Sequence, residues 1–231
     1  MIKLDSVCKR FQNHTALDNL CLEVSSGDIY GLLGANGAGK STTLNLLLGF
    51  LKPDAGSIQM THQESNTPIT SKDIGYIPEN VHLYPYLNGL ENLDYFCTLA
   101  GLHYSSEERT NFLTECGLQE DAHKKRTSAY SKGMRQKVGI AIAMAKKAQV
   151  YLLDEPASGL DPLASNELSI LLKKLAANGA AVLMASHDIF RVRETCNRIG
   201  ILKRGQLVKE IQSEEVTPRE LESIYLNFMK D

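Results

Sequence analysis

Gly34-Ala35-Asn36-Gly37-Ala38-Gly39-Lys40-Ser41 is the stretch from which the fold of this chain can be predicted. It matches G-x-x-x-x-G-K-[ST], a loop that binds phosphate. Backbone N–H groups that surround a polyphosphate need left-handed or strained angles, which the three glycines accept without a Cβ penalty. We expect a helix to follow, with its positive N-terminal end and Lys40 facing the β and γ phosphates. The hydroxyl of Ser41 or of its neighbour Thr42 would bind Mg²⁺.

The flanking residues support this interpretation. Asp28–Leu33 is a short apolar run typical of a strand, and Thr42–Leu51 has leucines at helical spacing. The alternative is a glycine-rich turn that matches the pattern by chance. A strand before the loop and a helix after it make that alternative the weaker one.

Two acidic residues supply the second half of a phosphoryl-transfer site. Val150–Leu153 is an apolar run of the kind found in buried parallel strands, and Asp154 and Glu155 follow it directly. Ligands bind at the carboxyl ends of parallel strands, so Asp154 is a candidate ligand of Mg²⁺. Glu155 is the candidate general base that activates water. The alternative is a strand that simply ends in two solvated acids.

Composition limits the class of protein. The chain has 231 residues, 43% of them hydrophobic and 23% charged, which indicates a globular domain or a core with one inserted subdomain. A net charge of −2 gives no general attraction for nucleic acid, so no nucleic-acid partner is expected. Five scattered cysteines indicate buried or half-buried free thiols in a reducing compartment. No apolar run approaches the roughly 20 residues that cross a bilayer, and the N-terminus does not resemble a signal peptide.

The rest of the chain alternates strands and helices. Short strands are predicted before the loop and over Ser57–Met60 and Ile74–Ile77, and a mainly helical insert over about residues 80–130. We expect Gly101 and Gly117 to mark helix ends. A helix over Leu168–Ala177 and a buried strand over Ala180–Ala185 then form a parallel α/β unit. Residues 199–210 should form a hairpin, and Thr217 and Pro218 should begin a helix that reaches about Met229.

Five motifs in one order make the chain resemble the nucleotide-binding subunit of an ABC transporter. After the loop at 34–41 come residues 130–136 (Tyr-Ser-Lys-Gly-Met-Arg-Gln), 153–156 (Leu-Asp-Glu-Pro), 158–161 (Ser-Gly-Leu-Asp) and 186–188 (Ser-His-Asp). The family pattern is Walker A, signature, Walker B, D-loop and switch histidine. The resemblance implies one ABC-type ATPase domain over residues 1–231. Its expected fold is α/β, a P-loop NTPase core with an N-terminal antiparallel β subdomain and the helical insert; ATP and Mg²⁺ are the expected cofactors.

The resemblance also implies roles for single residues. Phe11 would stack on adenine, although it could instead be an ordinary core residue. Ser131 and Gly133 would contact the γ-phosphate bound to a second copy, although Ser131 could be only a helix cap. His187 would touch the γ-phosphate and hold the attacking water, and Asp161 would couple the two sites across the dimer. Lys40, Glu155 and His187 would thus be the catalytic group.

Two departures from the family pattern stand out. Lys132 and Met134 replace small and polar residues of the commonest signature, Leu-Ser-Gly-Gly-Gln. Glu79 stands where a glutamine that senses Mg²⁺ is usual; its carboxylate could still approach Mg²⁺ through water, but it would repel an unshielded γ-phosphate. Both departures look like those of bacterial ATPases that pair with export-type permeases, including drug, antibiotic and bacteriocin-immunity exporters.

The resulting hypothesis is an ATPase subunit that acts as a homodimer, or as a heterodimer with a related subunit, on membrane permease subunits. It would be cytoplasmic and peripheral on the inner face of the plasma membrane, and would power export. Leu83, Tyr84, Pro85 and Tyr86 would form the docking surface, unless they fill the core of the insert. Non-transport ABC ATPases are the alternative class: they act on a membrane signalling or divisome complex, on ribosomes or on DNA.

Overall fold

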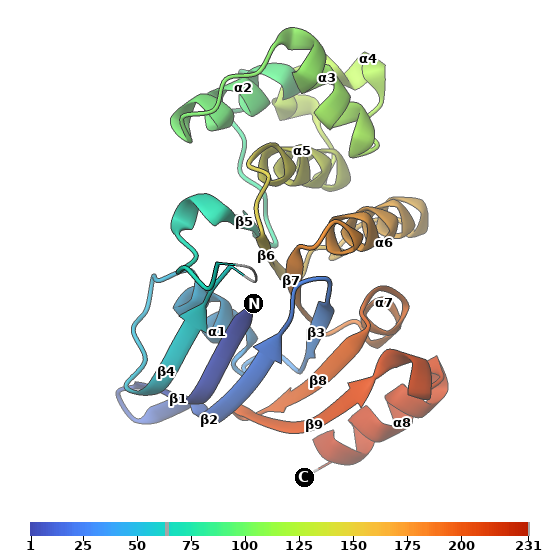
Figure 1. Ribbon diagram of the computed structural model, residues 1–231. Helices are drawn as coiled ribbons and strands as arrows, with labels where there is room; N and C mark the ends of the chain where they lie inside the picture. The colour runs from blue at the N-terminus through green and yellow to red at the C-terminus, as the bar shows by residue number, and fades with distance from the viewer. Residues whose placement is uncertain (63–64, 231) are drawn as a thin grey trace.

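A mainly parallel sheet forms the centre of the computed structural model, which describes residues 1–62 and 65–230 (Figure 1). Its six strands follow the order β5-β6-β7-β3-β8-β9, and only β9 runs antiparallel to its neighbour. The bounds are β3 (Ile29–Leu33), β5 (Ile74–Ile77), β6 (Val150–Asp154), β7 (Ala181–Ser186), β8 (Arg198–Lys203) and β9 (Gln206–Gln212). The predicted parallel α/β core and the hairpin at 199–210 are therefore confirmed.

The strand order places the ends of three strands side by side. Strand β7 pairs with β6 on one side and with β3 on the other, and Leu33 lies opposite Ser186 while Asp154 lies opposite Ala185. All three strands are parallel, so the loop after β3 lies at the same edge of the sheet as Asp154, the last residue of β6, and Glu155, which follows it.

An antiparallel sheet covers one face of the central sheet. Its strands are β1 (Ile2–Phe11), β2 (His14–Val24) and β4 (Ala55–Met60), in the order β2-β1-β4. Together with helix α1 (Lys40–Leu47) it buries a core that includes Leu4, Leu20, Leu44 and Leu152. This sheet is the predicted N-terminal β subdomain.

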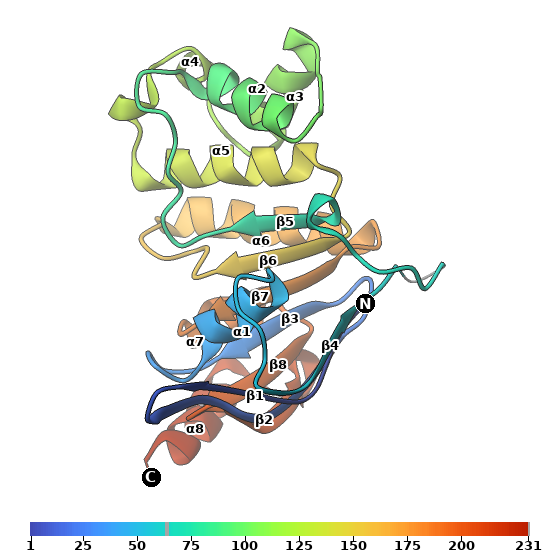
Figure 2. The ribbon, with the colours of Figure 1, turned by 90° about the vertical axis from the view of Figure 1, so that its left-hand side faces the viewer.

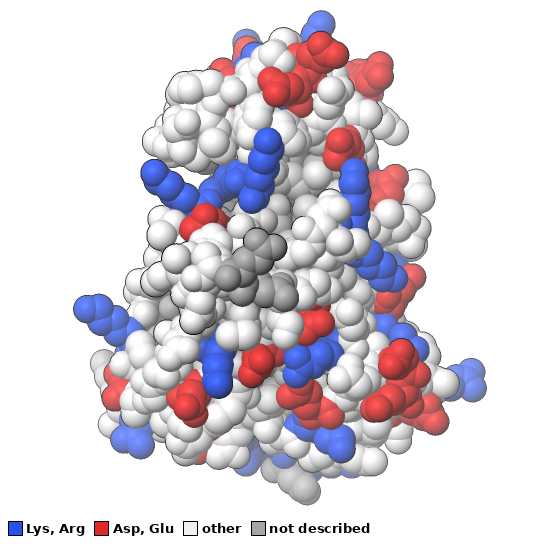
Figure 3. Space-filling view, viewed as in Figure 1, with Lys and Arg blue, Asp and Glu red and all other residues white. Residues whose placement is uncertain are grey.

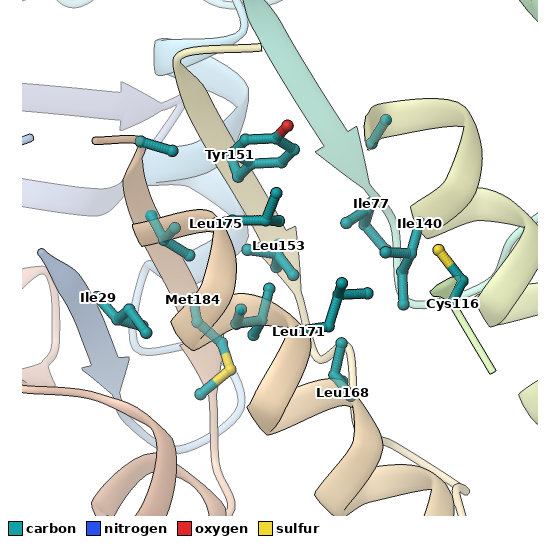
Figure 4. Close-up of a cluster of buried hydrophobic side chains, with 14 of the residues drawn as sticks. Ile29, Ile77, Cys116, Ile140, Tyr151, Leu153, Leu168, Leu171, Leu175 and Met184 are labelled. Atoms are coloured by element: carbon teal, nitrogen blue, oxygen red, sulfur yellow. The ribbon is translucent and has the colours of Figure 1, made fainter. Parts of the chain in front are cut away.

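A second core fills the opposite face of the central sheet. Figure 4 shows Leu153 and Met184, from β6 and β7, among leucines of α6 (Pro162–Ala177) and near Ile140 of α5 (Lys132–Ala145). The central strands are thus buried on both faces, which explains why they read as continuous apolar runs. The helices α7 (Ile189–Thr195) and α8 (Pro218–Met229) also contribute to this core.

Helices α2 (Gly89–Leu99), α3 (Ser106–Glu115) and α4 (Glu120–His123) lie on the far side of α5 from the sheet (Figure 2). Asn88 and Ser105 cap α2 and α3 through capping boxes. Gly101 and Gly117 have positive φ angles just beyond the two helices, as predicted for helix ends. Three single-turn 3₁₀ helices complete the described elements, over Ser71–Asp73, Thr127–Ala129 and Ser213–Glu215.

Some predicted boundaries were wrong. Helix α6 begins at Pro162, six residues before Leu168, because the Asp161 side chain accepts a hydrogen bond from the N–H of Ala164 and proline suits the first helical position. Helix α1 ends at Leu47 rather than at Leu51.

All five cysteines are free, but Cys21 is exposed rather than buried or half-buried. No helix in the described part of the chain is long and apolar enough to cross a bilayer.

Candidate functional site

The glycine-rich loop joins the end of β3 to the first turn of α1, and its glycines serve different needs. Gly37 and Gly39 have φ angles of 81° and 112°, which side chains rarely adopt. The φ angle of Gly34 is not in the left-handed region. Gly34 is needed for space instead, because a Cβ there would lie 2.6 Å from the carbonyl oxygen of Leu202.

Lys40 is the first residue of α1, and its side chain folds back against the glycine-rich loop. Its Nζ donates hydrogen bonds to the carbonyl oxygens of Gly34, at 2.6 Å, and Ala35, at 3.2 Å. The same nitrogen lies 3.5 Å from Oε1 of Glu155, and the side chain is only 6% exposed. The ammonium group is thus buried and held beside the glycine-rich loop by two carbonyl oxygens and a carboxylate. In this position it can also bind the oxygens of a phosphate held by the loop.

Glu155 combines a strained backbone with a well-anchored carboxylate. Its φ angle of 46° is in the left-handed region, which is unfavourable for a residue with a Cβ. Oε2 accepts hydrogen bonds from the Ser186 hydroxyl (2.9 Å) and from the N–H of His187 (3.3 Å), while Oε1 lies 2.8 Å from Nδ1 of His187. Strain of this kind persists where the surroundings fix one conformation, and it is common at functional sites.

The Asp154 carboxyl lies beside Glu155 and faces the loop. Burial raises its pKa, and the charges of Glu155 and Glu79 raise it further, whereas a hydrogen bond with Ser41 and the charge of Lys40 lower it. A hydroxyl and one or two carboxylates are the donors that Mg²⁺ takes, with water and phosphate oxygens completing its shell. The described residues form no cluster of three or more His, Cys, Asp or Glu that could hold a metal ion. The Ser41 hydroxyl and the Asp154 carboxylate fit Mg²⁺ whose remaining ligands are water and phosphate oxygens.

One cavity of about 290 Å³ brings most of the predicted site residues together. Phe11 lies at this cavity and is 43% exposed, so it is not the buried core residue that was the alternative. Glu79, with a side chain that is 48% exposed, contributes from the end of β5. The lining residues are Phe11, His14, Ala16, Ala35, Asn36, Gly37, Gly39, Lys40, Ser41, Thr42, Glu79, Asp154 and Glu155.

Six predicted site residues do not line this cavity: Gly34, Ala38 and His187, and the three residues that were predicted to act across a dimer. Ser131 caps α5 by accepting a hydrogen bond from the N–H of Met134, and Asp161 caps α6. Gly133 packs beside Leu160, where an added Cβ would lie 3.3 Å from the leucine side chain. Ser131 and Gly133 were predicted to contact a nucleotide bound by a second copy, and Asp161 to couple the two sites across the dimer. A single chain tests neither prediction.

The sequence interpretation missed three residues of the site. His14 and Ala16 line the cavity from β2, where they follow Phe11 across the hairpin turn. Ser186 holds the Glu155 carboxylate from the end of β7. For Ser186 a signal was available, since a hydroxyl at the end of a buried strand, beside a candidate histidine, can be expected to need a polar partner.

Comparison with known proteins agrees with this geometry. Residues 17–158 match the family model described as "ABC transporter". The chain is 37% identical to an uncharacterized ABC transporter ATP-binding protein of Synechocystis, over 85% of this chain and 56% of that protein. It is 33% identical to the bacitracin transport ATP-binding protein BcrA of Bacillus licheniformis, over 99% of this chain and 74% of that protein.

A solved structure is similar over almost its whole length. The ATP-binding cassette MJ0796, in a dimeric post-hydrolysis state bound to ADP and Pi, is 30% identical to this chain, with a TM-score of 0.79. The match covers 92% of this chain and 99% of that cassette. This chain spans only about half to three quarters of the length of the two sequence relatives above. It belongs to the ABC transporter family, as an ATP-binding domain of the ABC ATPase type.

Proposed function

We propose that this chain binds and hydrolyses ATP to power the export of a substrate through partner permease subunits. The observation that carries the proposal is the cavity in which the glycine-rich loop, Asp154 and Glu155 converge. Phosphoryl transfer needs a cradle for the phosphates and a group that orients and deprotonates the attacking water, and both lie in this one cavity.

The chain's own residues divide this work. The loop amides and the N-terminal end of α1 bind the β and γ phosphates, and the Lys40 ammonium group adds a positive charge beside the loop. Glu155 accepts the proton of the attacking water, while Ser186 and His187 hold its carboxylate in place. Ser41 and Asp154 would hold Mg²⁺, with Glu79 acting through water. Mg²⁺ would supply positive charge against the phosphate oxygens.

A second copy or a related subunit would complete the site. Ser131, Gly133 and Asp161 lie outside the cavity of their own chain, and the free N–H groups at the start of α5 suit an anion brought from elsewhere. Similarity to a cassette described as dimeric supports a homodimer or a heterodimer.

The surface proposed to receive the permease lies where the insert joins the core. Tyr86 is 81% exposed, whereas the Tyr84 ring packs on Tyr95, with the ring centroids 4.6 Å apart. A groove of about 330 Å³ beside them is lined by residues 80–83, Pro85, Thr127, Ser128, Lys132 and Arg135. A cytoplasmic segment of the permease would occupy this surface and would place the chain at the inner face of the plasma membrane.

The proposed direction of transport, export, is inferred from similarity alone. The relative BcrA is named for bacitracin transport, which supports an export-type partner for this chain. On the face shown in Figure 3, both basic and acidic side chains of described residues are present.

The test is the mass of Glu155→Gln in solution by light scattering, with and without MgATP. Glutamine keeps the shape of glutamate but cannot accept the proton, so ATP should stay bound and a dimer should accumulate. Lys40→Ala combined with Glu155→Gln is the control that should remain monomeric. Hydrolysis by Glu155→Gln at the parental rate would contradict the assignment of Glu155. A variant that binds no ATP would contradict the proposed function.

A further inference from the structure

The two departures from the usual family pattern meet in space. Lys132 is the first residue of α5, and Glu79 lies beyond the end of β5, yet Lys132 Nζ lies 3.9 Å from Glu79 Oε1. Lys132 Nζ also donates to the Ser158 hydroxyl at 3.4 Å, and that hydroxyl donates to the same Glu79 oxygen at 3.4 Å. Three segments that are far apart in sequence thus share one polar cluster.

The aliphatic part of the Lys132 side chain is also fixed, by its contact with the turn at Gly159. It crosses Gly159, where an added Cβ would lie 3.3 Å from Cδ of Lys132. Gly159 has a φ angle of 71°, so glycine there provides both the turn and the space for the lysine stem. The Lys132 side chain is 32% exposed, which is low for a lysine at the first turn of a surface helix.

The position of Glu79 explains why its carboxylate needs a positively charged partner when ATP binds. Glu79 lines the same cavity as Asp154 and Glu155, so three acidic residues line the cavity expected to hold phosphate. An unpaired carboxylate there would repel the γ-phosphate. Lys132 brings the opposite charge from α5, outside the cavity lining, and approaches the carboxylate from the groove that Asn80 and Arg135 also line.

We propose that Lys132 is a positioning residue: it neutralises Glu79, holds it beside Ser158 and thereby makes a carboxylate tolerable at the nucleotide cavity. The inference rests on the assignment of that cavity to ATP. Because Lys132 begins α5 and Ser158 lies in the turn before α6, the same cluster links the start of α5 to the turn before α6, next to the cavity assigned to nucleotide. Each contact is long and partly exposed, so the expected effect is modest.

A double-mutant cycle tests the coupling. Lys132→Met removes the charge but keeps a stem to cover Gly159, and Glu79→Gln removes the opposing charge with little change of shape. ATP affinity would be measured by titration calorimetry for the parent, both single variants and the double variant. We expect Lys132→Met to weaken ATP binding roughly two- to fivefold when Glu79 is present and to have little effect in the Glu79→Gln background.

Three further measurements separate this role from a merely structural one. Lys132→Arg should bind ATP like the parent, because it keeps the charge. The loss in Lys132→Met should be larger for ATP in EDTA than for MgATP, and it should shrink at about 1 M salt, where the screening length falls to roughly 3 Å. An equal loss in both backgrounds, or a Lys132→Arg variant that behaves like Lys132→Met, would overturn the inference. A parent protein that binds no ATP would instead contradict the proposed function on which it depends.

Discussion

Glu155 Oε1 lies 2.8 Å from Nδ1 of His187, although the two residues come from the ends of different strands. Strands β6 and β7 are parallel neighbours, and Asp154 pairs with Ala185, so the residues that follow them emerge side by side. The Glu155 side chain is 11% exposed and that of His187 58%, so the imidazole lies on the solvent side of the carboxylate. A histidine in this position can orient the carboxylate and still reach a bound phosphate.

Replacing His187 by alanine should therefore slow hydrolysis more than it weakens binding. We expect kcat to fall about a hundredfold, as is typical when one proton-handling or orienting group is removed, with KM for ATP nearly unchanged. His62→Ala is the control, since His62 contacts Gln149 and Asp73 away from the cavity. A steady-state assay on both variants decides the matter: a His187→Ala variant with parental kcat would exclude this role.

Lys40→Ala should mainly weaken nucleotide binding. The buried ammonium group donates hydrogen bonds to the carbonyl oxygens of Gly34 and Ala35, and alanine removes both. The Ala35 oxygen keeps a hydrogen bond from the N–H of Ala38, so the main loss is the positive charge beside the loop. We expect at least a tenfold loss of ATP affinity by calorimetry, corresponding to about 1.4 kcal/mol or more. Unchanged affinity would remove the phosphate-binding assignment of the loop.

Two glycines of the loop should differ in their effect on stability. An alanine Cβ at Gly39 would lie 2.7 Å from the Ala16 carbonyl oxygen and from Cδ2 of Leu17, whereas nothing lies within 4 Å at Gly37. Both need positive φ angles, so Gly37→Ala isolates the backbone strain, worth about 1–2 kcal/mol. We expect Gly39→Ala to lower the free energy of unfolding by about 3 kcal/mol or more, measured by urea denaturation without nucleotide. Equal losses in the two variants would show that the close contact is relieved.

The sequence predicted the parts of this site that depend on local pattern. Apolar runs such as Val150–Leu153 identify buried parallel strands, and the carboxyl ends of such strands locate the ligand. The sequence could not predict contacts that depend on strand order. Whether Lys132 reaches Glu79 depends on how α5 packs beside β5, and whether Ser186 reaches Glu155 depends on β6 and β7 being neighbours.

The Asp154 carboxylate, the expected ligand of Mg²⁺, should lower the free energy of unfolding of the protein when no ligand is bound. Burial and the Glu155 charge raise its pKa, so the fold favours the protonated form. That contribution is complete below the pKa of an unfolded aspartate, about 3.9, and is lost as the pH rises through the higher folded value. At pH 7 the ionised carboxyl therefore costs stability, and Asp154→Asn should remove this cost while keeping the hydrogen bond with Ser41.

We expect Asp154→Asn to raise the melting temperature at pH 7 by roughly 2 °C without Mg²⁺ or nucleotide. The gain should shrink as the pH is lowered toward about 4, where the parent also carries a neutral side chain. Scanning calorimetry at both pH values measures this, with Asp5→Asn, on an exposed position of β1, as the control that should change neither. A gain that persists at pH 4 would mean that packing rather than charge is responsible. The same variant should lose Mg²⁺-dependent hydrolysis, because the amide is a poorer ligand than the carboxylate that the cavity keeps at some cost to stability.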